Sequence, residues 1–170
     1  MYLTRLLLLA LLLAAPVALR AQLEKLPPED LELVQKQWPQ AKKISTGLRY
    51  VILKEGEGEA AQPGDLLSVL YRGALLSGKI FDESEDPDHP FMVRLGRGLV
   101  IQGWDQGLQL MKRGGKMLLI VPAELGYGTR GSPPTIPRNA TLVFEIDLLD
   151  IKRAEPLSPV LAPPADKKKK

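Results

Sequence analysis

The region from residue 47 to residue 152 contains many short segments with the pattern of β-strands and only one segment with the pattern of a helix. Apolar and polar residues alternate most clearly over 141–149, which predicts a strand with one buried face. Residues 104–111 carry apolar side chains at helical spacing. Many antiparallel strands and one helix predict an α+β domain in which the sheet packs over that helix. The other predicted strands are 49–54, 66–76, 79–81, 91–95 and 117–121.

Residues 1–21 have the composition of a signal peptide. A basic residue, Arg5, precedes an apolar run of Leu and Ala, and small residues lead to a cleavage point after Ala21. A run of about a dozen apolar residues is shorter than the ~20 that a membrane-spanning helix needs. We therefore expect this segment to direct export and to be removed, leaving no stable membrane span. A retained membrane anchor is the alternative interpretation.

The segments on either side of the predicted domain are short. Residues 22–46 are predicted to form a linker with a short helix, which begins near Pro28 and ends before Pro39. Residues 153–170 are rich in Pro and Lys, a composition typical of a disordered tail. The expected organisation is therefore a linker, a single domain at 47–152, and a tail.

Composition excludes several kinds of functional site. The chain has no cysteine, so disulfides, thiolate metal sites and a cysteine nucleophile are absent. A single histidine, His89, argues against a site with several His ligands and against a Ser-His-Asp triad. The net charge is +3, and four of the lysines form the terminal run 167–170. We therefore expect no metal, no cofactor and no binding to nucleic acid.

Two segments approach known motifs without completing them. Residues 73–80, GALLSGKI, nearly match a phosphate-binding loop, but Ile80 stands where that loop requires a hydroxyl group. The acidic residues of 82–88 lack the ligand order and the central glycine of an EF-hand calcium loop. We therefore expect a hairpin in the first case and a solvated acidic loop in the second.

Six aromatic residues lie on separate segments that only the fold can bring together. Three of them have a polar group, which needs a partner when the ring is buried. Asp82 directly follows one of them and places a carboxylate at its edge. At this point the six residues could form either a shared pocket or part of an ordinary hydrophobic core. The six are Tyr71, Phe81, Phe91, Trp104, Tyr127 and Phe144.

Four segments resemble, in order and spacing, the motifs of the FKBP-type peptidyl-prolyl cis-trans isomerases. They are VLYRGALLSGKIFDES, LGRGLVIQGWDQGLQLMKRGGK, PAELGYGTRG and IPRNATLVFEIDLLDI. The resemblance extends over about 47–151, and the lead-in TGLRYVILKEGEG is most similar to bacterial secreted members. It implies an FKBP-like fold, a twisted antiparallel β-sheet wrapped over one short α-helix. It also implies an enzyme that accelerates rotation about X–Pro bonds during the folding of exported proteins, here in the periplasm.

The resemblance also implies roles for individual residues. Trp104 would be the floor of a pocket for proline, Asp82 the carboxylate at its mouth, and the backbone N–H of Ile101 a donor to a substrate carbonyl. Macrolide inhibitors of the family are implied as ligands. The implied catalytic residues are Tyr71, Phe81, Asp82, Trp104, Tyr127 and Phe144, and the implied substrate-binding residues are Phe91, Val100, Ile101 and Ile136.

Some features depart from the family pattern. An acidic loop follows Asp82, where some members have an arginine that pairs with this aspartate, and Val93 replaces a frequent aromatic residue. The loop at 132–135 also differs, so substrate preference is the property least determined by the resemblance. The acidic loop predicts a preference for basic residues near the proline.

The sequence also allows two other functions and predicts an assembly state. The alternative functions are a chaperone module that binds proline peptides with little isomerase activity, and a structural domain recruited through its tails. We expect a monomer, because 22–43 is too short for the helical domain through which secreted relatives dimerise.

Overall fold

The computed structural model describes residues 24–154, and the predicted signal peptide and most of the predicted tail lie outside this range. Within it, no helix is both long and apolar enough to cross a membrane. In chain order the elements are α2 (Pro28–Gln37), β1 (Lys42–Lys43), β2 (Arg49–Lys54), β3 (Glu57–Ala60), β4 (Leu66–Leu75), β5 (Ile80–Ser84), β6 (Phe91–Arg94), α3 (Gln102–Gly107), the 3-10 turn η1 (Leu108–Leu110), β7 (Lys112–Arg113), β8 (Lys116–Val121), the 3-10 turn η2 (Ala123–Leu125) and β9 (Leu142–Lys152).

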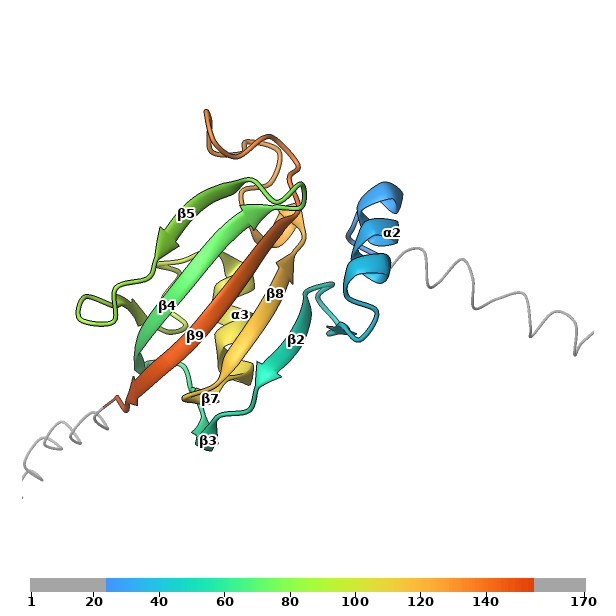
Figure 1. The fold of residues 1–170 in the computed structure, drawn as a ribbon. Coiled ribbons are helices and arrows are strands. Elements are labelled where there is room, and N and C mark those ends of the chain that lie inside the picture. Colours follow the sequence, from blue (N-terminus) through green and yellow to red (C-terminus); the bar gives the residue numbers. More distant parts are fainter. Residues whose placement is uncertain (1–23, 155–170) are drawn as a thin grey trace, which may run out of the picture.

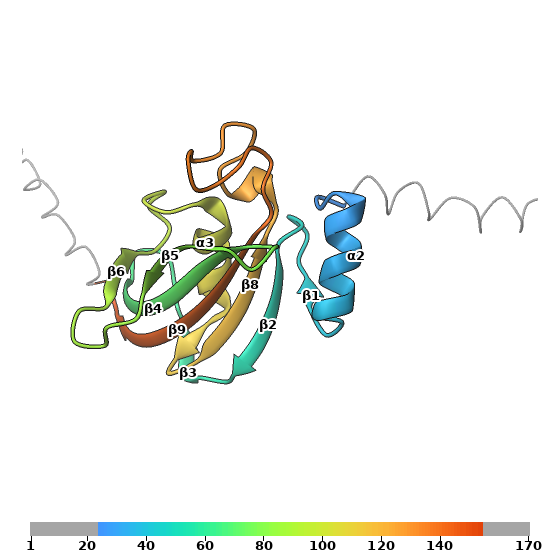
Figure 2. The ribbon, with the colours of Figure 1, turned by 45° about the horizontal axis from the view of Figure 1, so that its top comes forward.

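One curved antiparallel sheet forms the body of the molecule (Figure 1). Its strands follow the order β1-β2-β8-β9-β4-β5, with β6 also paired to β4, and β3 pairs with β7 in a separate two-stranded sheet. The two longest strands, β4 and β9, pair in the middle. Figure 2 shows α3 on the inner side of the curve. The prediction of an α+β fold with a sheet wrapped over one short helix is confirmed.

The core lies between the sheet and α3, as the alternation in the sequence indicates. The alternating residues of β9, namely Leu142, Phe144, Ile146 and Leu148, are all at most 4% exposed. On the opposite side of the core, Trp104, Leu108 and Met111 are buried. The helix itself starts two residues earlier than predicted and tightens into the 3-10 turn at its end, which is a common ending for a short helix.

Two glycines let α3 approach the sheet closely. Gly103 and Gly107 are four residues apart and therefore lie on one face of the helix. A Cβ atom on Gly103 would lie 2.5 Å from Val121 Cγ1, and one on Gly107 would lie 2.6 Å from Leu119 Cδ1. Neither distance leaves room for a larger residue, so the glycines set the spacing between α3 and β8.

The N-terminal helix α2 packs against the outer face of the sheet, outside β2 in Figures 1 and 2. Val34 of α2 is 1% exposed, and it belongs with Leu26 to a second apolar cluster. The sheet contributes Val51, Leu118, Ile120 and Val143 to this cluster. The expectation of a linker did not include these contacts, because Val143 occupies the face of β9 that the alternation assigns to polar residues.

Polar contacts hold this N-terminal segment in place. The Arg49 guanidinium donates hydrogen bonds of 3.0 and 2.6 Å to the two carboxylate oxygens of Glu24. Thr141 Oγ1 donates a 2.6 Å hydrogen bond to Asp30 in the first turn of α2. Burial would raise the pKa of Glu24, but the hydrogen bonds from Arg49 and the Leu26 N–H, together with nearby positive charges, lower it to about 2.

We predict that Glu24 stabilises the fold at neutral pH and loses this effect in acid. Because folding lowers its pKa from 4.5 to about 2, the contribution is complete above pH 4.5 and disappears as the pH falls toward 2. Glu24→Gln should therefore lower the free energy of unfolding at pH 7 by about 1 kcal/mol, a value reduced by solvent screening. Urea titrations at several pH values measure this. Glu32→Gln, at an exposed position of α2, is the matched control. An equal effect of both substitutions would contradict the assignment.

Candidate active site

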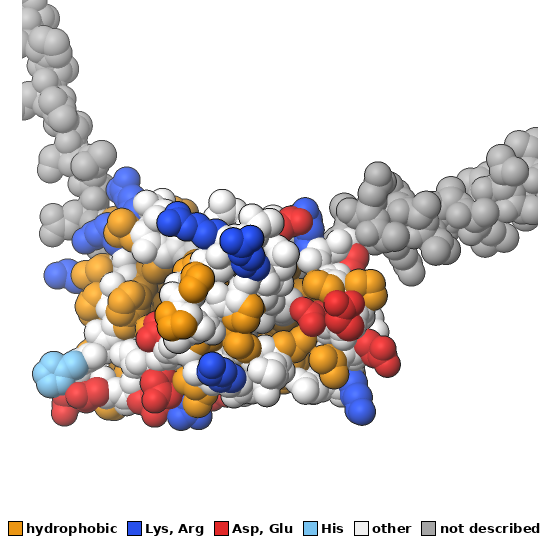
Figure 3. All heavy atoms as spheres, turned by 90° about the horizontal axis from the view of Figure 1, so that it is seen from above, with side chains coloured by type: hydrophobic (Ala, Val, Ile, Leu, Met, Phe, Trp, Pro, Cys, Tyr) orange, Lys and Arg blue, Asp and Glu red, His pale blue; other side chains and the backbone are white. Residues whose placement is uncertain are grey.

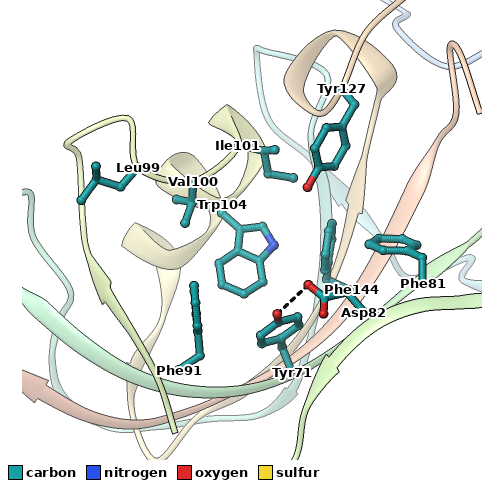
Figure 4. A pocket seen from close by; sticks show the side chains of 10 residues that line it. All are labelled: Tyr71, Phe81, Asp82, Phe91, Leu99, Val100, Ile101, Trp104, Tyr127 and Phe144. Carbon is teal, nitrogen blue, oxygen red and sulfur yellow. Dashed lines mark hydrogen bonds between the residues drawn. The ribbon is translucent and has the colours of Figure 1, made fainter. Parts of the chain in front are cut away.

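A pocket of about 190 Å³ opens on the inner side of the sheet, beside the start of α3 (Figure 4). Strands β4, β5, β6 and β9, the segment before α3, and the loop after η2 all contribute to it. Every predicted site residue except Ile136 lines it, and Leu99 is an additional member. The lining consists of Tyr71, Phe81, Asp82, Phe91, Leu99, Val100, Ile101, Trp104, Tyr127 and Phe144.

Trp104 is held in the base of the pocket by aromatic rings on several sides. Its ring centroid lies 5.0 Å from that of Tyr71, 5.4 Å from that of Phe144 and 6.2 Å from that of Phe91, always in an edge-to-face arrangement. The residue is 4% exposed. Such contacts add specific geometry to the apolar packing, so the indole cannot tilt without breaking several of them.

The indole Nε1 has no hydrogen-bond acceptor, the sole such buried side-chain nitrogen or oxygen among residues 24–154. Figure 4 shows this nitrogen on the edge of the ring that faces Phe144. The Phe144 ring packs edge to face against the indole. The indole nitrogen itself therefore has no hydrogen-bond partner within the described part of the chain.

The wall beside Trp104 depends on a glycine. Phe81 and Phe144 meet edge to face with their centroids 5.6 Å apart. Gly73 of β4 pairs with Phe144 of β9 on one side and with Asp82 of β5 on the other. A Cβ atom on Gly73 would lie 2.8 Å from Phe144 and 2.9 Å from Phe81. The absence of a side chain at residue 73 thus makes space for the two rings.

One polar pair lies at the edge of this apolar pocket. The Tyr71 hydroxyl donates a 2.7 Å hydrogen bond to Asp82 Oδ2. Burial and this bond to the carboxylate raise the pKa of Tyr71, so the hydroxyl stays protonated and remains a donor. Asp82 is thus partnered by Tyr71, whereas in some family members an arginine of the following loop pairs with this aspartate. Among the described residues, no arginine contacts this carboxylate.

The mouth of the pocket is formed by side chains that are partly open to solvent. Tyr127 is 40% exposed, and its hydroxyl points toward the centre of the pocket in Figure 4. The Ile101 carbonyl accepts hydrogen bonds from the N–H groups of Trp104 and Asp105 and so begins α3. No described residue accepts a hydrogen bond from the Ile101 N–H. A donor and a hydroxyl are thus available to a ligand.

Two positions differ from the sequence-based expectation. Ile136 is 4% exposed and belongs to the core, so it supports the pocket from within and does not line it. Its backbone closes a turn with Ser132 through two hydrogen bonds. Leu99, which is 74% exposed, lines the pocket instead. An exposed leucine in a glycine-rich turn has no periodic signal that could have indicated this role.

The acidic loop after Asp82 is partly neutralised by its own neighbours. Arg72 of β4 forms ion pairs with Glu83, at 3.4 Å, and with Glu85. Asp86 lies 2.8 Å from the ring nitrogen Nδ1 of His89. The two ion pairs of Arg72 reduce the charge that the loop presents to a ligand.

The sequence profile described as FKBP-type peptidyl-prolyl cis-trans isomerase matches residues 57–149. The chain belongs to this family. It is 47% identical over 113 residues to the isomerase FkpA of Escherichia coli K12, covering 66% of this chain and 41% of FkpA. It is 53% identical over 93 residues to human peptidyl-prolyl cis-trans isomerase FKBP2, covering 55% of this chain and 66% of that protein.

Solved structures of family members share the fold. The crystal structure of E. coli FkpA matches with a TM-score of 0.67 and 43% identity, covering 75% of this chain and 59% of that one. A Pseudomonas syringae peptidyl-prolyl cis-trans isomerase matches with a TM-score of 0.65 and 32% identity, covering 74% and 92%. The chain spans less than half the length of E. coli FkpA, to which its sequence is similar. The similarity therefore covers only part of that protein.

We predict that Gly73→Ala distorts the pocket without changing the sheet topology. The new methyl group would push Phe81 and Phe144 apart, and overpacking of this kind costs about 1–3 kcal/mol. Urea unfolding measures the loss of stability, and near-ultraviolet circular dichroism reports the movement of the rings. Adding Phe81→Leu to the same chain should recover part of the stability, because the smaller side chain yields space. Strictly additive effects of the two substitutions would show that the methyl group is accommodated elsewhere.

Proposed function

We propose that this chain catalyses cis–trans isomerisation of X–Pro bonds in polypeptides, as its family membership suggests. The observation that carries the proposal is the pocket: a buried indole floor, aromatic walls and a single polar pair at one edge. A pyrrolidine ring is small, apolar and flat enough for such a floor. The absence of a nucleophilic cysteine is no objection, because the reaction makes and breaks no covalent bond.

Rotation about an X–Pro bond is favoured by a site that is apolar and excludes water. Rotation about an X–Pro bond has a barrier of ~18–20 kcal/mol because it disrupts amide resonance, and it takes tens to hundreds of seconds without a catalyst. The twisted amide is less dipolar than the planar one. An apolar pocket that excludes water therefore stabilises the twisted state more than the planar state. A difference of ~4 kcal/mol would accelerate rotation about a thousandfold.

The surrounding groups fit supporting roles. Trp104 would receive the proline ring, while Phe81 and Phe144 would keep water from it. The Ile101 N–H and the Tyr127 hydroxyl would hold substrate carbonyl groups. The Tyr71–Asp82 pair would set the polarity of one edge and need not transfer a proton, because the reaction involves none.

A chaperone module without catalysis is the second candidate, and the pocket argues against it. A binding module could lose the aromatic walls and still hold an extended peptide. Here all six aromatic residues contribute to one cavity. A purely structural domain would fill that cavity with its own side chains. The enzyme is therefore the function that the geometry favours.

We further propose that the chain is exported and acts as a monomer. The composition of residues 1–21 supports export. Support for the monomer comes from α2, whose apolar side chains already pack on the sheet of the same chain. Sedimentation showing a stable dimer at micromolar concentration would contradict the monomer.

An isomerisation assay on residues 22–170 tests the activity. Phe81→Ala should reduce kcat/KM far more than Tyr127→Phe does, because it opens the apolar wall to water. The second substitution removes one hydrogen bond, worth ~1 kcal/mol or about fivefold in rate. Circular dichroism confirms that both variants are folded. Similar losses in the two variants would mean that exclusion of water is not how the pocket acts.

Binding at Trp104 can be followed by its fluorescence. A macrolide inhibitor of the family should quench Trp104, because its proline-like ring would cover the indole. Trp38 packs with the second apolar cluster on the outer face of the sheet and should not respond. A Trp38→Phe chain isolates the signal. If that chain binds the inhibitor with unchanged emission, the assignment of Trp104 as the floor is wrong.

A further inference from the structure

The loops around the pocket carry arginines that have no partner in the protein. Eight arginines lie in the described part of the chain. Five of them make side-chain hydrogen bonds or ion pairs, namely Arg49, Arg72, Arg94, Arg113 and Arg153. For the other three, Arg97, Arg130 and Arg138, no side-chain hydrogen bond or ion pair is found, and all three are exposed.

These three arginines lie on the two segments that bring residues to the mouth of the pocket. Arg97 is two positions before Leu99, and Arg130 is three positions after Tyr127. Arg138 lies on the returning arm of the second loop, where the Asn139 N–H donates to the Gly128 carbonyl at 2.9 Å. The three arginines without partners thus all belong to loops that also carry residues of the pocket lining.

The backbone holds these arginines in defined places. The Asp105 carboxylate of α3 accepts hydrogen bonds from the N–H groups on both sides of Arg97, from Gly96 at 2.9 Å and from Gly98 at 3.1 Å. The turn carrying Arg130 is closed by a 3.0 Å hydrogen bond from the Gly131 N–H to the Tyr127 carbonyl. The side chains therefore extend from ordered turns, and the Asp105 carboxylate accepts these backbone hydrogen bonds without forming an ion pair with Arg97.

No acidic residue offsets the arginines within their own loops. Neither 95–101 nor 126–141 contains Asp or Glu, whereas 82–88 contains five acidic residues. Figure 3, which shows the molecule from above, has orange side chains over its middle, red ones at the lower left and at the right, and blue ones mainly in the upper part and also at the lower edge. Both kinds of loop contribute to the pocket, through Asp82 at the start of the acidic loop and through Leu99 and Tyr127 of the arginine-bearing loops. The acidic side is weakened by Arg72, while the basic side has no such partner.

We propose that Arg97, Arg130 and Arg138 form a recognition site for carboxylate groups of the substrate polypeptide, on residues next to the proline held in the pocket. The inference rests on the proposed isomerase function and adds a substrate class to it. Guanidinium groups match carboxylates with two parallel hydrogen bonds, and a group that has no internal partner loses no existing interaction on binding. Acidic sequence around proline is then favoured. This conclusion replaces the preference for basic sequence that the acidic loop alone predicts.

The test compares peptides that differ at one position near the proline, with Glu, Gln or Lys two residues before or two residues after it. Exchange between cis and trans forms is measured by nuclear magnetic resonance, which needs no coupling protease. The native chain should act on one of the Glu peptides about fivefold better than on the matching Gln peptide, the size expected for exposed ion pairs. The advantage should shrink at high salt.

Variants assign the effect to the arginines. Arg97→Gln, Arg130→Gln and Arg138→Gln in one chain should abolish the preference for Glu and leave activity on the Gln peptides unchanged. The control chain carries Lys36→Gln, Lys54→Gln and Lys152→Gln, which change the net charge equally at exposed positions of α2, β2 and β9. It should retain the preference. An unchanged preference in the arginine variant, or an equal loss in the control, would overturn the proposal.

The same peptides distinguish failure of the arginine site from failure of the proposed isomerase function. If no peptide is isomerised, the function fails, and binding of the Glu and Gln peptides followed by Trp104 fluorescence then decides whether the arginines bind carboxylates. If the Gln peptides are isomerised and Glu brings no gain at either position, the function stands and the arginine site is rejected.

Discussion

The contact between α3 and β8 is the constraint on which the pocket depends. Gly103 and Gly107 bring the helix so close to the sheet that a single methyl group would collide with Val121 or Leu119. Glycine lowers helix propensity by ~1 kcal/mol per residue, so this short helix is kept by its packing and not by its own sequence. Trp104 lies between the two glycines and is therefore held at a fixed depth. The indole is thus placed at the base of the pocket because the helix that carries it lies close against the sheet.

The two faces of the sheet pack against different elements. The inner face binds α3 and forms the pocket, while the outer face is covered near β2 by α2. Glu24 and Asp30 hold that helix through Arg49 and Thr141. The N-terminal segment thus stabilises the strands that support the pocket without contacting the pocket itself. An apolar strip on the outer face that would otherwise meet water, or another molecule, is closed within the chain.

Most of the fold and the pocket could be predicted from the sequence, and the exceptions have physical reasons. Long strands with clear alternation were found at nearly their observed bounds, whereas β1, β3 and β7 have two to four residues and no apolar pattern. The pocket residues were identified through family motifs, since periodicity cannot show which rings share a cavity. Ile136, which was expected in the pocket, lies in the core, and Leu99, for which no role was predicted, lines the pocket, because burial in a loop follows no period. The Tyr71–Asp82 bond and the unpartnered arginines depend on strand register and loop placement, which only the structure provides.

The division between pocket and rim has a consequence for selectivity. In the proposed reaction every substrate would bring the same pyrrolidine ring to Trp104, so an apolar floor would not distinguish one X–Pro bond from another. Discrimination must come from groups that contact the neighbouring residues of the polypeptide. Exposed charges act over about 8–10 Å at moderate ionic strength, which corresponds to two or three residues of extended chain. The arginine-bearing loops and the acidic loop each carry a residue that lines the pocket, namely Leu99, Tyr127 and Asp82. Their charges are therefore the groups in this chain that are best placed to act on the residues next to a bound proline.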